Sequence, residues 1–396
     1  MSISRRPAEV EGRVAVSHRI AAASFRVAGA FAVVAVVWAV LVLVRGGSWW
    51  GPLHSFLAGS VLFAIAGASQ MFTITWAAAP PPPDALSKTQ RRVTAAGVVL
   101  VLWGVATSTI WAGGLGALTI ITGLGLLAFS IVSAIRRSLL RRFDLASRFY
   151  LLAIACGLVG VGLGGVMSMD LAGDAFTDIR TAHARLNVVG LAGLTITGTL
   201  PTILPTFVPS KAVSGQEARV ALYLAVAAAV VMAAGAALGG MPVGIGVVAA
   251  AVSLALILGG IVRRLGRKGL RGGLPYFQVV VGCVWLVVWA SVDGVRLMSG
   301  ADAMPFSGWT AAAVVAGVGQ VLLGSLSYLL PVLAGPPPRL GRNLARTKGY
   351  PWLPLVVANL AGIALAAGWE TVAVVAMAMW VADFAIRLAR MEWRGE

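Results

Sequence analysis

The sequence predicts an all-α integral membrane protein with twelve transmembrane helices, and three observations support this fold class. First, 59% of the 396 residues are hydrophobic and only 11% are charged, which leaves too little polar surface for a soluble domain of this length. Second, the hydrophobic residues gather in runs of about 20 residues, long enough to cross a hydrocarbon core of about 30 Å. Third, Lys and Arg are enriched in every second turn, as in multi-pass membrane proteins.

Each hydrophobic run is predicted to form one span. The spans are expected approximately at residues 24–45, 52–77, 93–112, 114–135, 149–170, 182–208, 218–238, 243–262, 275–297, 309–333, 352–368 and 371–389. Residues 24–390 are therefore predicted to form a single transmembrane domain, preceded by a cytoplasmic tail at 1–23 and followed by a short cytoplasmic tail at 391–396.

The basic residues predict the topology. The turns that follow odd-numbered spans contain little more than Arg45, Arg180 and Arg296. The turns that follow spans four and eight are basic, with Arg136, Arg137, Arg141, Arg142, Arg263, Arg264, Arg267 and Lys268. By the positive-inside rule, these turns and both termini lie in the cytoplasm, and the protein belongs to the plasma membrane. The net charge of +17 then reflects topology and attraction to the lipid bilayer, and it excludes nucleic acid as a partner.

An internal repeat is predicted from a shift of 126 residues, which lays spans five to eight over spans nine to twelve. The matched pairs are Tyr150 with Tyr276, Gly193 with Gly319, Gly198 with Gly324, and Pro205 with Pro331. Span two carries a looser copy in which Gly67 aligns with Gly198. The twelve helices are therefore expected to form three arcs of four, approximately 24–135, 149–262 and 275–389.

Two of the three histidines lie in the first turns of spans two and six, and both spans are predicted to run from outside to inside. His54 and His183 are therefore expected at the same outer depth. A neutral imidazole is a common ligand of haem iron and copper, and ionisable groups inside a bilayer are usually functional. The alternative for both residues is an interfacial histidine that is solvated by the lipid headgroups.

Arg185 and two methionines extend the candidate site. Arg185 either extends outward to the headgroups or pairs with a carboxylate such as a haem propionate. Met167 and Met169, at the end of span five, carry thioethers that suit Cu(I) together with imidazole, although methionine is also an ordinary apolar filler. Cys156 and Cys283 lie in apolar spans and are interpreted as core residues.

The two histidine segments resemble helices of the catalytic subunit of haem–copper oxidases, especially the cbb-type and nitric-oxide-reductase branch. The second helix of that family opens with Pro-Leu-His-Thr/Ser, and the corresponding residues here are Pro52-Leu53-His54-Ser55. The tenth helix of the family carries His-x-His followed by Leu-Gly-x-x-Gly; here the residues are His183-Ala184-Arg185 and then Val189-Gly190-Leu191-Ala192-Gly193. The segments are also similar to the NnrS-type membrane proteins and to spans of actinobacterial membrane proteins.

The resemblance implies a twelve-helix subunit of three arcs, with haem b and copper as candidate cofactors. It implies that His54 is an axial haem ligand, His183 a second ligand and Arg185 a propionate anchor. Arg185 stands where the family has its second histidine, and the copper centre of an oxidase needs three further histidines. Apart from these two the chain has only His18, in the predicted cytoplasmic tail, so oxygen-reducing activity is excluded.

Three functions follow as expectations. The leading one is a haem- or copper-binding membrane protein in electron transfer, respiratory-chain assembly, or metal or nitric oxide handling. The second is a secondary transporter whose pathway would be formed by four amide side chains, Gln70, Gln278, Gln320 and Asn359. The third is a cofactor-free structural or assembly subunit of a respiratory or copper-enzyme complex. Enzymatic activity is left open, and no catalytic residue is assigned.

Overall fold

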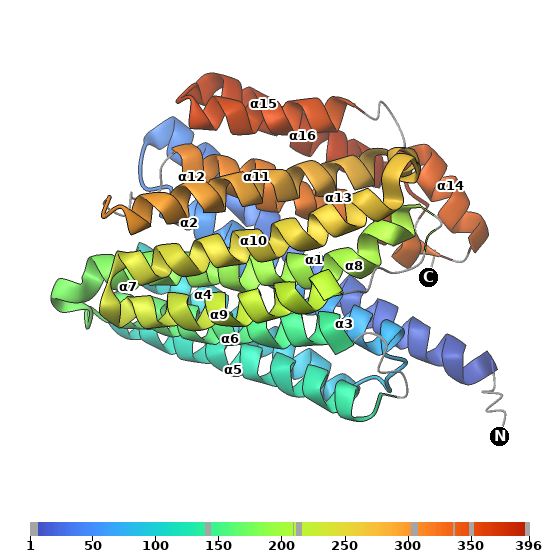
Figure 1. The fold of residues 1–396 in the computed structure, drawn as a ribbon, viewed down its shortest axis with the longest axis horizontal. Coiled ribbons are helices and arrows are strands. Elements are labelled where there is room, and N and C mark those ends of the chain that lie inside the picture. Colours follow the sequence, from blue (N-terminus) through green and yellow to red (C-terminus); the bar gives the residue numbers. More distant parts are fainter. Residues whose placement is uncertain are drawn as a thin grey trace. The chain divides into compact units, whose positions relative to one another are not determined.

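The computed structural model describes residues 7–138, 144–208, 210, 216–301, 308–335, 337–347 and 352–392. Its elements are α1 (Pro7–Arg45), α2 (Trp50–His54), η1 (Ser55–Val61), α3 (Leu62–Trp76), α4 (Asp84–Ala106), α5 (Ile110–Arg136), α6 (Asp144–Ser168), η3 (Gly173–Ala175), α7 (Phe176–Arg185), η4 (Leu186–Gly193), α8 (Leu194–Phe207), α9 (Gln216–Leu238), α10 (Gly240–Leu265), η5 (Gly266–Gly272), α11 (Gly273–Met298), α12 (Gly308–Ala312), η6 (Ala313–Gly319), α13 (Gln320–Ala334), α14 (Pro337–Thr347), α15 (Leu353–Ala366) and α16 (Glu370–Ala389). The described residues contain no strand, so the all-α prediction is confirmed (Figure 1).

Nine helical runs of the described residues are long and apolar enough to cross a membrane. One of these runs, Gly240–Met298, contains two predicted spans joined by η5. Two other predicted spans fall on helices outside the nine: α4, whose first turns carry Asp84, Lys88 and Arg91, and α15, which has 14 residues. The predicted spans fall on helices, but the third, expected at 93–112, runs past the end of α4 at Ala106 into the start of α5 at Ile110. The count of twelve crossings and the cytoplasmic termini stay predictions.

The first helix begins earlier than its predicted span. The span was expected from residue 24, but α1 starts at Pro7 and includes most of the predicted N-terminal tail. Figure 1 shows the start of α1 projecting past the adjacent α3. Residues 1–6 and 393–396 of the predicted tails, and Arg141 and Arg142 of the predicted cytoplasmic turn, lie outside the described residues.

The chain divides into two compact units. Unit 1 contains residues 1–198 and 229–243, and unit 2 contains residues 199–228 and 244–396. In unit 1, α5 packs against both α4 and α6, and α1 packs along α3. In unit 2, α11 packs against α13, and α15 packs against α16. Both candidate histidines belong to unit 1.

Three π-helical segments occur at corresponding places in the predicted second, sixth and tenth spans. A shift of 131 residues, which lays Gly67 on Gly198, moves η1 onto residues 186–192 of η4. A shift of 126 residues moves η4 onto 312–319, which contains η6. π-Helical turns are rare. Because three of them occur at positions that the predicted repeat matches, they agree with that repeat.

The glycines used to predict the repeat also occupy similar surroundings. An added Cβ at Gly67 would lie 2.8 Å from Cβ of Ser24 on α1, and one at Gly324 would lie 2.7 Å from Cβ of Gln278 on α11. Gly198 approaches Phe149 on α6 in the same way. In each case the glycine lets its helix approach the preceding long helix closely.

Candidate metal-binding site

His54 is the last residue of α2 and leads directly into the π-helical segment η1. Its Nδ1 lies 2.9 Å from the backbone oxygen of Trp50, one turn earlier. Because a carbonyl oxygen only accepts hydrogen bonds, Nδ1 must carry the proton. In the neutral form of the ring, Nε2 then carries the lone pair, and it is the atom that a metal ion would use.

His183 reaches the same protonation pattern through a contact between helices. It lies on α7, and its Nδ1 lies 2.7 Å from the backbone oxygen of Gly160 on α6. Nδ1–H therefore donates to this carbonyl, and Nε2 again keeps its lone pair. Asn187 donates from Nδ2 to the backbone oxygen of His183 at 2.8 Å.

A glycine on α6 makes room for the His183 ring. An added Cβ at Gly164 would lie 2.8 Å from Cε1 and 3.0 Å from Nδ1 of His183. At Gly160, an added Cβ would lie 2.6 Å from Nδ2 of Asn187. The glycine-rich segment of α6 therefore shapes the surface on which His183 and Asn187 rest.

The structure brings the two imidazoles together. Their ring centroids lie 6.3 Å apart, and their planes differ by 15°. The two rings are stacked, with a centroid separation inside the range of about 4.5–7 Å that is usual for offset aromatic pairs. A metal ion bound between two opposite Nε2 atoms, at about 2.0–2.1 Å from each, would put the centroids roughly 6 to 6.5 Å apart. A separation of 6.3 Å is therefore compatible both with a stacked pair and with two imidazoles that would hold one metal ion between them.

Trp50 adds an aromatic partner to one side of the pair. Its ring centroid lies 4.1 Å from that of His54, with an interplanar angle of 21°. The same residue accepts the Nδ1–H hydrogen bond through its backbone. Trp50 thus restrains the position of the imidazole with its backbone and the orientation of the ring with its side chain.

Arg185 ends α7 two residues after His183 and is 7% exposed. This low exposure favours a partner within the protein or a bound ligand over extension of the side chain to the headgroups. Its role as a propionate anchor stays a prediction.

The two methionines have different surroundings from the histidines. Met169 is 39% exposed, and its thioether lies over Gly114 on α5. Met167 is half-buried near the end of α6. Among the described residues, no group of three or more His, Cys, Asp or Glu side chains is placed to hold a metal ion. The two imidazole centroids lie 6.3 Å apart, whereas the roles of Met167 and Met169 as metal ligands stay predictions.

Sequence reasoning missed two parts of the site. One is the stacking of Trp50 on His54, for which the spacing of four residues on a helix was an available signal. The other is the space that Gly164 leaves for the His183 ring, which the glycine-rich run of span five could have indicated. Neither protein-family models nor curated proteins give a match to the chain.

Proposed function

We propose that this chain is an integral membrane protein that binds haem or copper through His54 and His183. The observation that carries the proposal is the 6.3 Å separation of two nearly parallel imidazoles. The proposed role is electron transfer, respiratory-chain assembly, or metal or nitric oxide handling in the plasma membrane. The long apolar helices are consistent with a location in a lipid bilayer.

The hydrogen bonds of the imidazoles support the same proposal. Histidines that bind metals usually donate their other ring N–H to a carboxylate, a backbone carbonyl or water, which fixes the tautomer and the ring orientation. Both histidines have a backbone carbonyl in this position, at 2.9 Å and 2.7 Å. An interfacial histidine solvated by headgroups does not require such a pair of restraints.

The donor set suits two cofactors. His54 and His183 would hold the iron of a haem, which would supply one-electron chemistry. The same pair suits Cu(I), which accepts imidazole and thioether ligands. Arg185 favours haem, because a guanidinium pairs well with a propionate carboxylate. Haem b is therefore the first candidate and copper the second.

The residue inventory argues against oxygen reduction. A copper centre of the oxidase type needs three histidines beyond the haem ligands. The chain has only His18 besides the proposed pair, and it lies on α1 well before that helix enters its predicted span. We therefore propose a binding or electron-transfer role without oxygen-reducing catalysis.

The test is a spectrum of the protein purified from membranes, recorded oxidised and reduced, together with iron and copper analysis. Haem binding predicts a Soret band that shifts on reduction and about one iron per chain. Copper binding predicts about one copper per chain without a Soret band. A fully folded protein that takes up neither metal, even after reconstitution with haem or Cu(I), would refute the proposal.

A further inference from the structure

The segment η5 joins α10 to α11 in unit 2 and has the sequence Gly-Arg-Lys-Gly-Leu-Arg-Gly. Three of its side chains are basic and exposed: Arg267, Lys268 and Arg271. Among the described residues, none of the three is paired with a carboxylate. The nearby carboxylate of Glu217 pairs instead with Arg263 at 3.1 Å and Arg264 at 2.8 Å. The segment therefore presents a concentrated positive charge.

A leucine lies within this basic segment. Leu270 is 64% exposed, although it is flanked by glycine and arginine rather than by other apolar residues. A single exposed leucine is tolerated in water. It is favourable at a membrane surface, where the apolar side chain enters the lipid and the cations meet the headgroups.

The conformation of the segment is held by a tyrosine. Tyr276 is 4% exposed, and an added Cβ at Gly269 would lie 2.6 Å from its hydroxyl oxygen. An added Cβ at Gly272 would lie 2.6 Å from Cβ of the same tyrosine. The two glycines thus let the backbone lie directly against Tyr276, so that the basic side chains extend from a supported turn.

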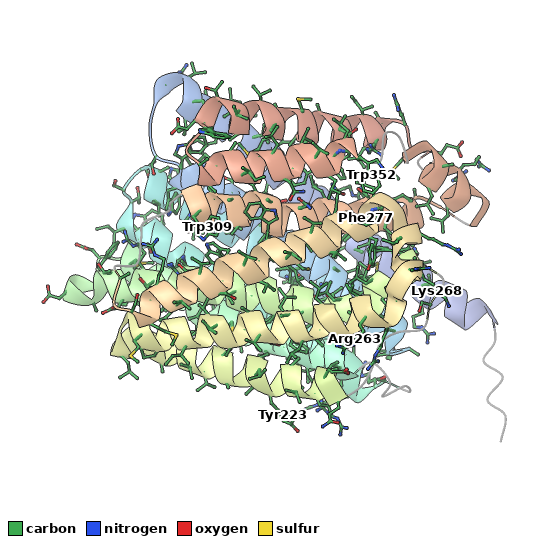
Figure 2. The ribbon with its side chains drawn as sticks, turned by 45° about the horizontal axis from the view of Figure 1, so that its top comes forward. Tyr223, Arg263, Lys268, Phe277, Trp309 and Trp352 are labelled. Atoms are coloured by element: carbon green, nitrogen blue, oxygen red, sulfur yellow. The ribbon has the colours of Figure 1, made fainter. Side chains whose placement is uncertain are left out.

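Two aromatic residues, Phe277 and Trp352, indicate where this end of unit 2 would lie relative to the membrane surface. The rings of Phe277 and Trp352 lie 5.2 Å apart, and Trp352 is exposed. Figure 2 shows both residues toward the same end of the unit 2 helices as Lys268, with Trp309 toward the other end. Tryptophan is enriched at membrane–water interfaces, so the exposed Trp352 supports a headgroup-level position for this end of unit 2.

We propose that η5 binds the phosphate of an anionic phospholipid through Arg267, Lys268 and Arg271, while Leu270 inserts beside its acyl chains. Anionic lipid is favoured over a soluble phosphate because an exposed leucine contributes nothing to binding a phosphate ion. Each basic residue near an anionic surface contributes about 1 kcal/mol. Loss of all three side-chain charges is therefore expected to weaken binding about 100-fold.

The test uses the purified full-length chain in neutral detergent, with phosphatidylglycerol or phosphatidylcholine added. Bound lipid is measured by native mass spectrometry, and Tm is recorded in parallel. The wild type is expected to retain phosphatidylglycerol in preference to phosphatidylcholine and to gain Tm with phosphatidylglycerol alone. The triple variant R267Q/K268Q/R271Q is expected to lose both effects.

The matched control is the triple variant R45Q/R180Q/R296Q, which removes three arginines from turns predicted to face the opposite side. It is expected to keep the preference for phosphatidylglycerol. Leu270→Ser is expected to weaken lipid binding several-fold without changing the effect of added inorganic phosphate on Tm. The proposal is wrong if both triple variants lose the preference equally, or if inorganic phosphate alone displaces the lipid at similar concentrations.

Discussion

Units 1 and 2 carry different side chains in predicted spans that the repeat matches with each other. In unit 1, His54 and His183 lie with their centroids 6.3 Å apart. In unit 2, Trp309 occupies the position that the repeat matches with His183, and its ring lies 6.2 Å from that of Trp285. An indole N–H only donates hydrogen bonds, whereas a neutral imidazole has a lone pair for a metal ion. Corresponding predicted spans thus carry two imidazoles in unit 1 and two indoles in unit 2.

The largest effect on metal binding is expected when the histidines of unit 1 are replaced by aromatic residues without a metal-binding lone pair, as in unit 2. His54→Phe and His183→Phe each keep an aromatic ring but remove the lone pair, and each is expected to abolish haem or copper binding. The control is His18→Phe, which changes the third histidine of the chain and should leave the bound metal unchanged. Metal analysis and the absorption spectrum measure the effect. Normal metal content in either phenylalanine variant would contradict the comparison.

The next effect concerns the glycine surface beneath His183. Gly164→Ala places a Cβ 2.8 Å from Cε1 of His183 and is expected to displace the ring, at a cost of roughly 1–3 kcal/mol. Metal affinity should fall by about tenfold or more. Gly162→Ala is the matched control on the same helix, because its Cβ would meet only Cδ1 of Ile121 at 4.0 Å. Equal affinities of the two variants would show that Gly164 does not position the ring.

A smaller effect is expected from the aromatic partner of His54. Trp50→Leu keeps the backbone carbonyl that accepts the Nδ1–H hydrogen bond but removes the stacked ring. Stacking of this kind contributes about 0.5–1.5 kcal/mol, so metal affinity should fall several-fold. Trp50→Phe should restore most of the loss. Nitrogen-15 labelling of histidine, which occurs only three times in the chain, would show whether His54 keeps its tautomer in both variants.

The smallest effect is expected in unit 2. Nε1 of Trp309 is buried and has no hydrogen-bond partner in the structure. Trp309→Phe removes this unsatisfied donor and should leave the metal content unchanged, with Tm equal to or slightly above that of the wild type. A loss of bound metal would mean that unit 2 also contributes to cofactor binding, and the contrast between the units would fail.

The sequence predicted the helical class because hydrophobicity and charge are local properties of the chain. It also predicted that His54 and His183 lie at the same depth, because each lies in the first turn of its predicted span. The carbonyl of Gly160 could not be predicted, because it comes from a different helix and depends on how closely α6 and α7 pack. The π-helical segments were also missed, since no residue pattern in η1, η4 and η6 distinguishes them from ordinary helix.

Met169 illustrates the limit of reasoning from chemistry alone. Its thioether was a reasonable Cu(I) ligand by composition, and it precedes the loop that leads to His183. In the structure its side chain lies over Gly114 on α5 and remains 39% exposed. The end of α6 packs against α5 as well as α7, and the role of Met169 as a Cu(I) ligand stays a prediction.

The most direct test is a titration that counts metal ions per chain in the wild type and in the two single variants H54F and H183F. If the two imidazoles hold one ion between them, the wild type binds one haem or one copper, and each single variant binds none with comparable affinity. If instead either variant retains a full equivalent of metal at wild-type affinity, the two histidines do not form a shared site and the account is contradicted.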